Sequence, residues 1–287
     1  MVIIPALETH RTRTKKTHMK ARKEFFLFAS ALSLILVLAS CDEDDDSRFF
    51  GSPCNITCQN GGSVNSSNCT CNCPAGFTGQ FCEEAVFACG GMYTDPRDGK
   101  TYSTVQIGSQ CWFRENLRYA GSLPQITNQN SWNAIWNNGN PTGQAAWCIY
   151  DNNSMLYEFH FGYLYTWYAV SSGSICPPGW RVPGMNDWLV LEGFLGSDAG
   201  GKMKEVGAGW LNPNTGANNQ SGFSARPGGM RGYEFSGIGE STYWWSTYQI
   251  PQDSRLALGF YVINSSAGLI NAPQAKASGY SCRCIKN

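Results

Sequence analysis

Cys176-Pro177-Pro178-Gly179-Trp180-Arg181-Val182-Pro183 is the stretch that best indicates how the larger part of this chain folds. Its three prolines hold the backbone extended, so a helix can begin only behind them. Gly184 or Asn186 would serve as the N-cap and Gly196 as the C-cap of that helix. Its inward face is marked by apolar side chains at i, i+3 and i+7: Trp188, Leu191 and Leu195.

On both sides of this helix the sequence favours short strands. Asp98-Gly99 is a hairpin signal before a β-rich segment at 101–107. Residues 131–147 look like an Asn- and Trp-rich insertion with turns, and 161–170 fit either a helix or a buried strand. We expect an α+β protein, mainly antiparallel β, with one clear helix. Its further strands are expected at 110–117 (or a short helix), 243–246, 255–263 and 279–285.

The charge balance excludes one class of partner. Residues 1–40 hold seven of the 21 Lys and Arg residues and two of the 21 Asp and Glu residues, so residues 41–287 carry 14 basic and 19 acidic side chains, a net charge of −5. Nucleic acid is therefore not an expected partner. His160 is the one histidine after residue 40, so a multi-histidine metal site is excluded. Between Phe159 and Phe161, we expect His160 to be packed in the core.

The sequence contains no clear enzyme signature, and we expect no catalytic residue, cofactor or metal. Its carboxylates are scattered, with no pair placed for glycoside hydrolysis. A sugar-binding surface could come from side chains of the Trp- and Asn-rich insertion, which would stack on a sugar face and bond its hydroxyls: Trp132, Asn133, Trp136, Asn137 and Asn138. The alternative is that both tryptophans are buried under a loop. Trp180, Trp188, Trp244 and Trp245 are expected in the core.

Motifs spread over residues 89–287 resemble the Fibrobacter-major paralogous domain. They are Asp98-Gly99-Lys100-x-Tyr102, Gln110-Cys111-Trp112, Glu115-Asn116-Leu117, Leu164-Tyr165-x-Trp167, Cys176 to Pro183, Gly222-Phe223-Ser224-Ala225, Pro227-Gly228-Gly229-x-Arg231, Trp245-Ser246-Thr247 and Arg283-Cys284. The resemblance implies a C-type-lectin-like fold, similar also to formylglycine-generating enzymes, over residues 83–287. Gly184 departs from the family, which commonly has a capping threonine there, and Cys282 stands where the family usually has an apolar residue.

Six cysteines belong to this domain and allow fifteen pairings. The resemblance suggests Cys176–Cys284, and leaves Cys89–Cys111 and Cys148–Cys282 as the remaining pairs. The alternative is that Cys282-x-Cys284 is a redox or metal pair, as in the sulfatase-activating relatives. An exported chain with an even number of cysteines favours disulfides.

Residues 54–82 contain six cysteines in 29 residues, too few residues to fold without covalent links. Gln59-Asn60-Gly61-Gly62 and Pro74-Ala75-Gly76-Phe77 resemble an epidermal-growth-factor-like (EGF-like) module. The family pattern implies Cys54–Cys69, Cys58–Cys71 and Cys73–Cys82, although Val64 stands where the third cysteine usually falls. No acidic calcium motif precedes Cys54, and a spacer is the expected role.

Residues 1–40 are expected to be a signal peptide. A basic region precedes a 14-residue apolar run at 25–38, too short for a comfortable membrane span. Leu38-Ala39-Ser40-Cys41 resembles a bacterial lipobox, which implies a lipid on Cys41. The alternatives are a plain secretory signal or a single membrane helix. Met19 is the expected true start.

Residues 41–53 are expected to be a tether. Its acidic run, Asp42-Glu43-Asp44-Asp45-Asp46, resembles the surface-export signal of Bacteroidota lipoproteins. We therefore expect a lipid-anchored protein on the outer face of the outer membrane that binds a glycan or a matrix protein without catalysis. The alternatives are a surface enzyme acting on polysaccharide or on protein cysteines, and an architectural envelope protein.

Overall fold

The computed structural model describes residues 54–139 and 141–287. Its chain divides into two units, Met1–Pro53 and Cys54–Asn287. The expected signal peptide, Cys41 and the acidic tether lie outside the described residues. Within the described part, no helix has the length and apolar character needed to cross a bilayer.

Residues 54–86 form a region held together by disulfides. Strand β1 (Ser63–Asn65) pairs with β2 (Thr70–Asn72), and β3 (Phe77–Thr78) pairs with β4 (Glu84–Ala85), both antiparallel. Cys82 is the one buried apolar side chain among the described side chains of this region, so there is little core to stabilise it. Three disulfides supply the stability instead: Cys54–Cys69, Cys58–Cys71 and Cys73–Cys82.

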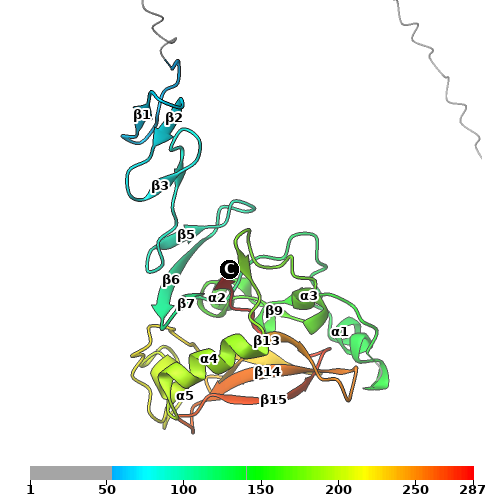
Figure 1. The fold of residues 1–287 in the computed structure, drawn as a ribbon. Coiled ribbons are helices and arrows are strands. Elements are labelled where there is room, and N and C mark those ends of the chain that lie inside the picture. The colour runs from blue at the N-terminus through cyan, green and yellow to red at the C-terminus, as the bar shows by residue number, and fades with distance from the viewer. Residues whose placement is uncertain (1–53, 140) are drawn as a thin grey trace, which may run out of the picture. The chain divides into compact units, whose positions relative to one another are not determined.

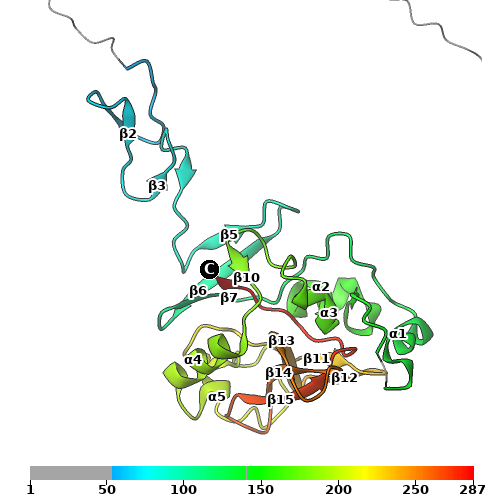
Figure 2. The same ribbon diagram turned by 45° about the vertical axis from the view of Figure 1, so that its right-hand side comes forward.

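A five-stranded sheet contains strands from both the beginning and the end of the larger domain. Its order is β10 (Trp180–Arg181), β16 (Ile285–Lys286), β7 (Gln110–Phe113), β6 (Thr101–Ile107) and β5 (Met92–Thr94). The chain terminus thus lies between β10 and β7 (Figure 2). The expected Asp98-Gly99 turn joins β5 to β6, with Gly99 at φ +73°, where a glycine is favoured.

A second five-stranded sheet forms the centre of the domain. Its order is β12 (Phe235–Ile238), β11 (Gly228–Arg231), β13 (Ser241–Gln249), β14 (Leu256–Ile263) and β15 (Ile270–Ala275). All neighbours are antiparallel except β11 and β13. Successive side chains of β13 point to opposite faces, so Trp244 enters one hydrophobic cluster and Trp245 another. Both tryptophans are fully buried, as are Trp188 and, nearly so, Trp180.

Helix α4 (Met185–Leu195) covers one face of this sheet (Figure 1). Trp188, Leu191 and Leu195 are its buried residues, as the spacing predicts. Gly184 is the N-cap and has no side chain to accept a helix N–H, but the Asp187 carboxylate accepts the Gly184 N–H at 2.7 Å. Helix α5 (Ala199–Met203) follows directly.

The expectation of one clear helix is wrong. The Asn-rich insertion contains α1 (Gln129–Trp136) and the 3-10 turn η1 (Asn137–Gly139), with Asn128 as N-cap. Turn η2 (Tyr150–Asn152) precedes α2 (Ser154–Phe161), and α3 (Trp167–Ser171) follows the short β8–β9 pair (Trp147–Cys148 with Leu164–Tyr165). These helices have only five to eight residues, too few for a clear apolar period.

The larger domain contains the disulfides Cys89–Cys111 and Cys176–Cys284, whereas the expected pair Cys148–Cys282 does not form. In an extended segment, side chains two residues apart point to the same side, so the sulfurs of Cys282 and Cys284 both reach Cys176. Sγ of Cys282 lies 4.0 Å from Sγ of Cys176. Cys148 is buried in a different cluster, and burial raises the pKa of each free thiol to about 12. Burial therefore favours the neutral form of both thiols in the folded protein.

Candidate functional site

Of the two interpretations of the Trp- and Asn-rich insertion, burial under the fold holds for Trp132. Trp132 is fully buried, with the Arg231 guanidinium 4.4 Å from its ring. Trp136 is half-buried and stacks on Tyr233 with 4.7 Å between ring centroids. Asn133 accepts a bond from Gln129, and Asn137 lies exposed at the helix C-cap. A buried indole cannot stack on a sugar, so Trp132 is a core residue.

Asn116, just beyond β7, bonds to three distant parts of the chain. Its side chain is buried, and its Oδ1 accepts from Trp244 Nε1 at 2.9 Å and from Arg283 Nε and Nη2 at 3.1 and 2.9 Å. Its Nδ2 donates to the Phe161 carbonyl and to Ser281 Oγ. Because every donor and acceptor of this amide is engaged, Asn116 fixes the position of Arg283.

Arg283 is a buried cation without an acidic partner. Its exposed fraction is 1%, and among the described residues no carboxylate forms an ion pair with it. Besides Asn116 it bonds to the Phe223 carbonyl, and the Phe223 ring lies 4.1 Å away. Burial lowers the pKa of the guanidinium from 12.5 to about 9. Three of its five N–H groups are thereby used, and two remain for another acceptor.

Arg283 lines a cavity of about 90 Å³. Segments from β7, α2 and the loops after α5 contribute the rest of the lining: Arg114, Glu115, Asn116, His160, Glu205, Ser224 and Arg226. We call this the arginine pocket. It contains three guanidinium groups and two carboxylates, which gives it a net positive charge. A small anionic group is the ligand that complements both its size and its charge.

Both carboxylates of the arginine pocket are already engaged. Glu115 accepts from Ser103 N and Oγ at 2.8 and 2.9 Å, and Glu205 pairs with Arg226 at 2.6 Å. Arg114 donates to the Gly222 carbonyl and to Ser224 Oγ, and forms no ion pair with a described residue. The Ser103 donors are neutral, so Glu115 keeps its negative charge, and the three guanidinium groups and two carboxylates leave the pocket one net positive charge.

His160 is exposed and lines this pocket, which corrects the expectation of a packed core histidine. The reason is that α2 is a surface helix with no fully buried residue. The two flanking phenylalanines suggested a core position, but Phe159 is itself exposed.

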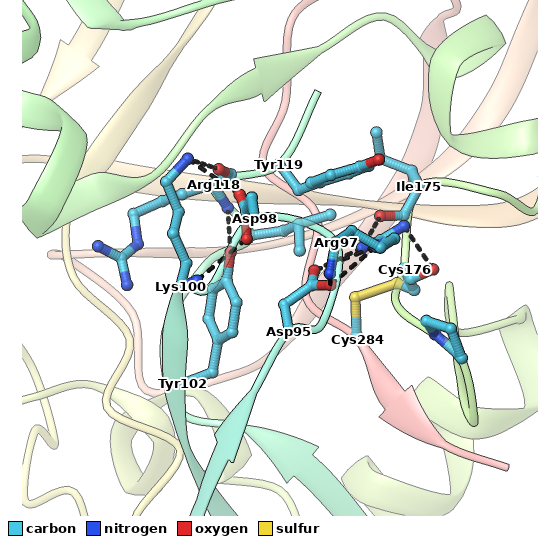
Figure 3. Close-up of polar contacts among 12 residues, drawn as sticks. Asp95, Arg97, Asp98, Lys100, Tyr102, Arg118, Tyr119, Ile175, Cys176 and Cys284 are labelled. Carbon is cyan, nitrogen blue, oxygen red and sulfur yellow. Dashed lines mark hydrogen bonds and ion pairs between the residues drawn. A yellow bond between two sulfur atoms is a disulfide. The ribbon is translucent and has the colours of Figure 1, made fainter. Parts of the chain in front are cut away.

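Arg97 is a second arginine whose guanidinium group is hydrogen-bonded within the protein, and it has a structural role (Figure 3). Nε and Nη2 donate to the buried Asp95 carboxylate, and the remaining N–H groups donate to three backbone carbonyls just before and at the Cys176 disulfide: Ser174, Ile175 and Cys176. The Tyr119 ring lies 3.6 Å from the guanidinium carbon. All five N–H groups are used, so Arg97 has none to offer a ligand.

Metal-ligand geometry occurs at one cysteine group in the described part of the chain. The sulfurs of Cys176, Cys282 and Cys284 lie within 4.8 Å of one another, but two of them form the disulfide. A disulfide sulfur is not a thiolate ligand, so this group is a covalent staple with a neighbouring thiol.

The sequence pattern does not identify the arginine pocket as a site, although several residues of the pocket belong to the family motifs. Glu115-Asn116, Ser224 and Arg283 come from motifs far apart in the chain, and the fold brings them to one cavity. No solved structure matches this chain. A family model does match residues 105–286, well over half of the chain. The chain therefore belongs to the Fibrobacter succinogenes major domain family.

Proposed function

We propose that this protein is a lipid-anchored surface protein whose C-terminal domain binds an anionic ligand in the arginine pocket and does not catalyse a reaction. The lipid is on Cys41, an EGF-like module at 54–82 acts as a spacer, and residues 83–287 have a C-type-lectin-like architecture. The ligand lies outside the cell.

The buried Arg283 guanidinium is the observation that carries this proposal. Burying a cation without an acid partner is costly, and apolar side chains would be cheaper at the same place. The cost is understandable where the cation faces a cavity and keeps two N–H groups for an acceptor. A bound anion would supply the missing partner and raise the pKa of Arg283 again.

The environment of Ser224 favours binding over nucleophilic catalysis. Its hydroxyl receives bonds from Arg114 and Asn219, at 3.2 and 3.0 Å, and donates to the Gly222 carbonyl. An activated serine would instead donate to a base such as His160. The pocket thus presents donors to a ligand and no base-activated hydroxyl.

The surface location rests on the sequence. The basic region, the apolar run of 14 residues, the Leu-Ala-Ser-Cys close and the acidic run agree with an exported, lipidated chain. Five disulfides support an oxidising environment. Intact mass of the protein from its host tests the lipid on Cys41, and digestion by protease added to whole cells tests exposure. An unmodified Cys41 or full protection would contradict the location without touching the pocket.

Acetate titration at constant ionic strength tests the pocket. We expect acetate to shift the arginine side-chain NMR signals of the full chain and to raise its melting temperature, because a ligand that binds the folded state stabilises it. Arg226→Gln should remove this response, since it leaves Glu205 unpaired beside the anion. Arg255→Gln is the matched control, at an exposed arginine with its own acid partner. Equal responses of both variants, or none in the unchanged protein, would contradict the proposal.

A further inference from the structure

The arginine pocket adjoins a larger, partly apolar hollow. This hollow, of about 460 Å³, shares His160, Glu205 and Arg226 with the pocket and adds Phe159, Phe161 and Ala208. A ligand whose anionic group enters the pocket would therefore place its next atoms against aromatic rings. We call this hollow the phenylalanine shelf.

Helix α2 extends the apolar surface beyond the shelf. Met155, Leu156 and Phe159 have exposed fractions of 92%, 55% and 69%. They fall at i, i+1 and i+4, on one side of the helix. Contiguous apolar side chains beside a charged cavity are typical of a recognition surface for a partner that is itself apolar with one charged end.

Resting on the proposed function, we infer that the ligand is the C-terminal end of a peptide or protein whose last residue is bulky and apolar. Its terminal carboxylate binds Arg283, Arg114 and Arg226, and its last side chain packs on Phe159 and Phe161. A cavity of about 90 Å³ accepts a carboxylate but not a sugar ring. Besides the residues that it shares with the pocket, the shelf is lined by two aromatic rings and an alanine, which favours an apolar side chain over an acidic sugar.

The test compares three ligands on the full chain. They are acetyl-Gly-Ala-Phe as the free acid, the same peptide as its C-terminal amide, and glucuronate. We expect the free acid to bind roughly tenfold or more tightly than the amide, because the charged hydrogen bonds to the guanidinium groups are lost. We also expect it to bind more tightly than glucuronate. Equal affinity of acid and amide would overturn the inference.

Phe159→Ser tests the shelf separately from the pocket. It should weaken the free-acid peptide roughly tenfold, the value of one phenylalanine contact, and leave acetate binding unchanged. Phe194→Ser is the matched control, at an exposed phenylalanine of α4 (64% exposed). If Phe159→Ser and Phe194→Ser bind the peptide alike, or if glucuronate binds best, the peptide ligand is wrong while acetate binding still supports the pocket. If acetate also fails to bind, the proposed function fails.

Discussion

Arg97 and Arg283 are both engaged in the folded domain, yet they solve the problem of a buried charge in opposite ways. Arg97 has the fully buried Asp95 as its counter-ion and uses all five N–H groups on protein acceptors. Arg283 has no described counter-ion and keeps two N–H groups beside a cavity. The first arrangement is complete within the protein, whereas in the proposed function the second is completed by a ligand.

This difference indicates which arginine serves the fold. The Arg97 guanidinium holds the backbone at Ser174, Ile175 and Cys176, next to the disulfide that joins this segment to the last strand. The Arg283 guanidinium is itself held, by Asn116. Loss of Arg97 should therefore affect stability, and loss of Arg283 should affect binding.

The largest stability effect is expected for Arg97→Ala. It leaves the Asp95 carboxylate buried and unpaired and frees three carbonyls, which should lower the free energy of unfolding by about 3 kcal/mol. Urea unfolding measures this loss. A loss below about 1 kcal/mol would mean that the Asp95–Arg97 pair does not stabilise the fold.

Cys284→Ala should cost less, because a second sulfur is already in place. Cys282 lies 4.0 Å from Cys176, so we expect oxidative folding to form Cys176–Cys282 instead. Most of the stabilisation from closing a long loop, about 4.7 kcal/mol for 100 residues, would be kept. Peptide mapping detects the new pair. Arg283 lies between the two cysteines, so acetate should also bind more weakly; a free thiol at Cys176 would contradict the prediction.

The pH dependence of stability should distinguish Arg283 from an apolar side chain. Burial lowers its pKa from 12.5 to about 9, so between these values the unfolded chain binds more protons than the folded one. The charge therefore destabilises the folded protein fully below pH 9, and this penalty is relieved as the pH rises. Relative to Arg283→Met, the unchanged protein should gain about 1 kcal/mol from pH 8 to about pH 10. A constant difference would contradict a lowered pKa.

Arg255→Ala should have the smallest effect, although its pair with Asp253 repeats the local bonds of Arg97 with Asp95. In each, the arginine backbone N–H and Nε donate to Oδ1 and Nη2 donates to Oδ2. Arg255 is exposed, so water replaces the lost bonds. Urea unfolding of this variant should match the unchanged protein. A loss as large as that of Arg97→Ala would show that burial is not the deciding factor.

Local signals in the sequence identified much of the fold. Asp98-Gly99 predicted the β5–β6 hairpin, and the spacing of Trp188, Leu191 and Leu195 predicted α4. Helices α1 and α2 were missed because they are short, although Asn128 and Asn153 are N-cap signals that preceded them. The one wrong cysteine pair was Cys148–Cys282. Cys282 and Cys284 are two residues apart, so both sulfurs lie beside Cys176, and only Cys284 is bonded to it.

The arginine pocket could not be predicted because it depends on contacts distant in sequence. Asn116 bonds to Trp244 and Arg283 across 128 and 167 residues. The family motifs include these residues, but a motif does not show that its residues contact those of another motif in the fold. Burial also reversed one expectation, because His160 proved to be exposed, whereas Trp132 is a core residue, as one of the two interpretations of the insertion held.

Arg283→Met provides the most direct measurement. The substitution removes the buried cation and leaves no buried charge behind, so the free energy of unfolding should equal that of the unchanged protein or exceed it by up to about 4 kcal/mol. In the same samples, the acetate-induced shift should disappear. A variant that remains folded but still binds acetate as the unchanged protein does would contradict the central claim that Arg283 is kept for an anionic ligand.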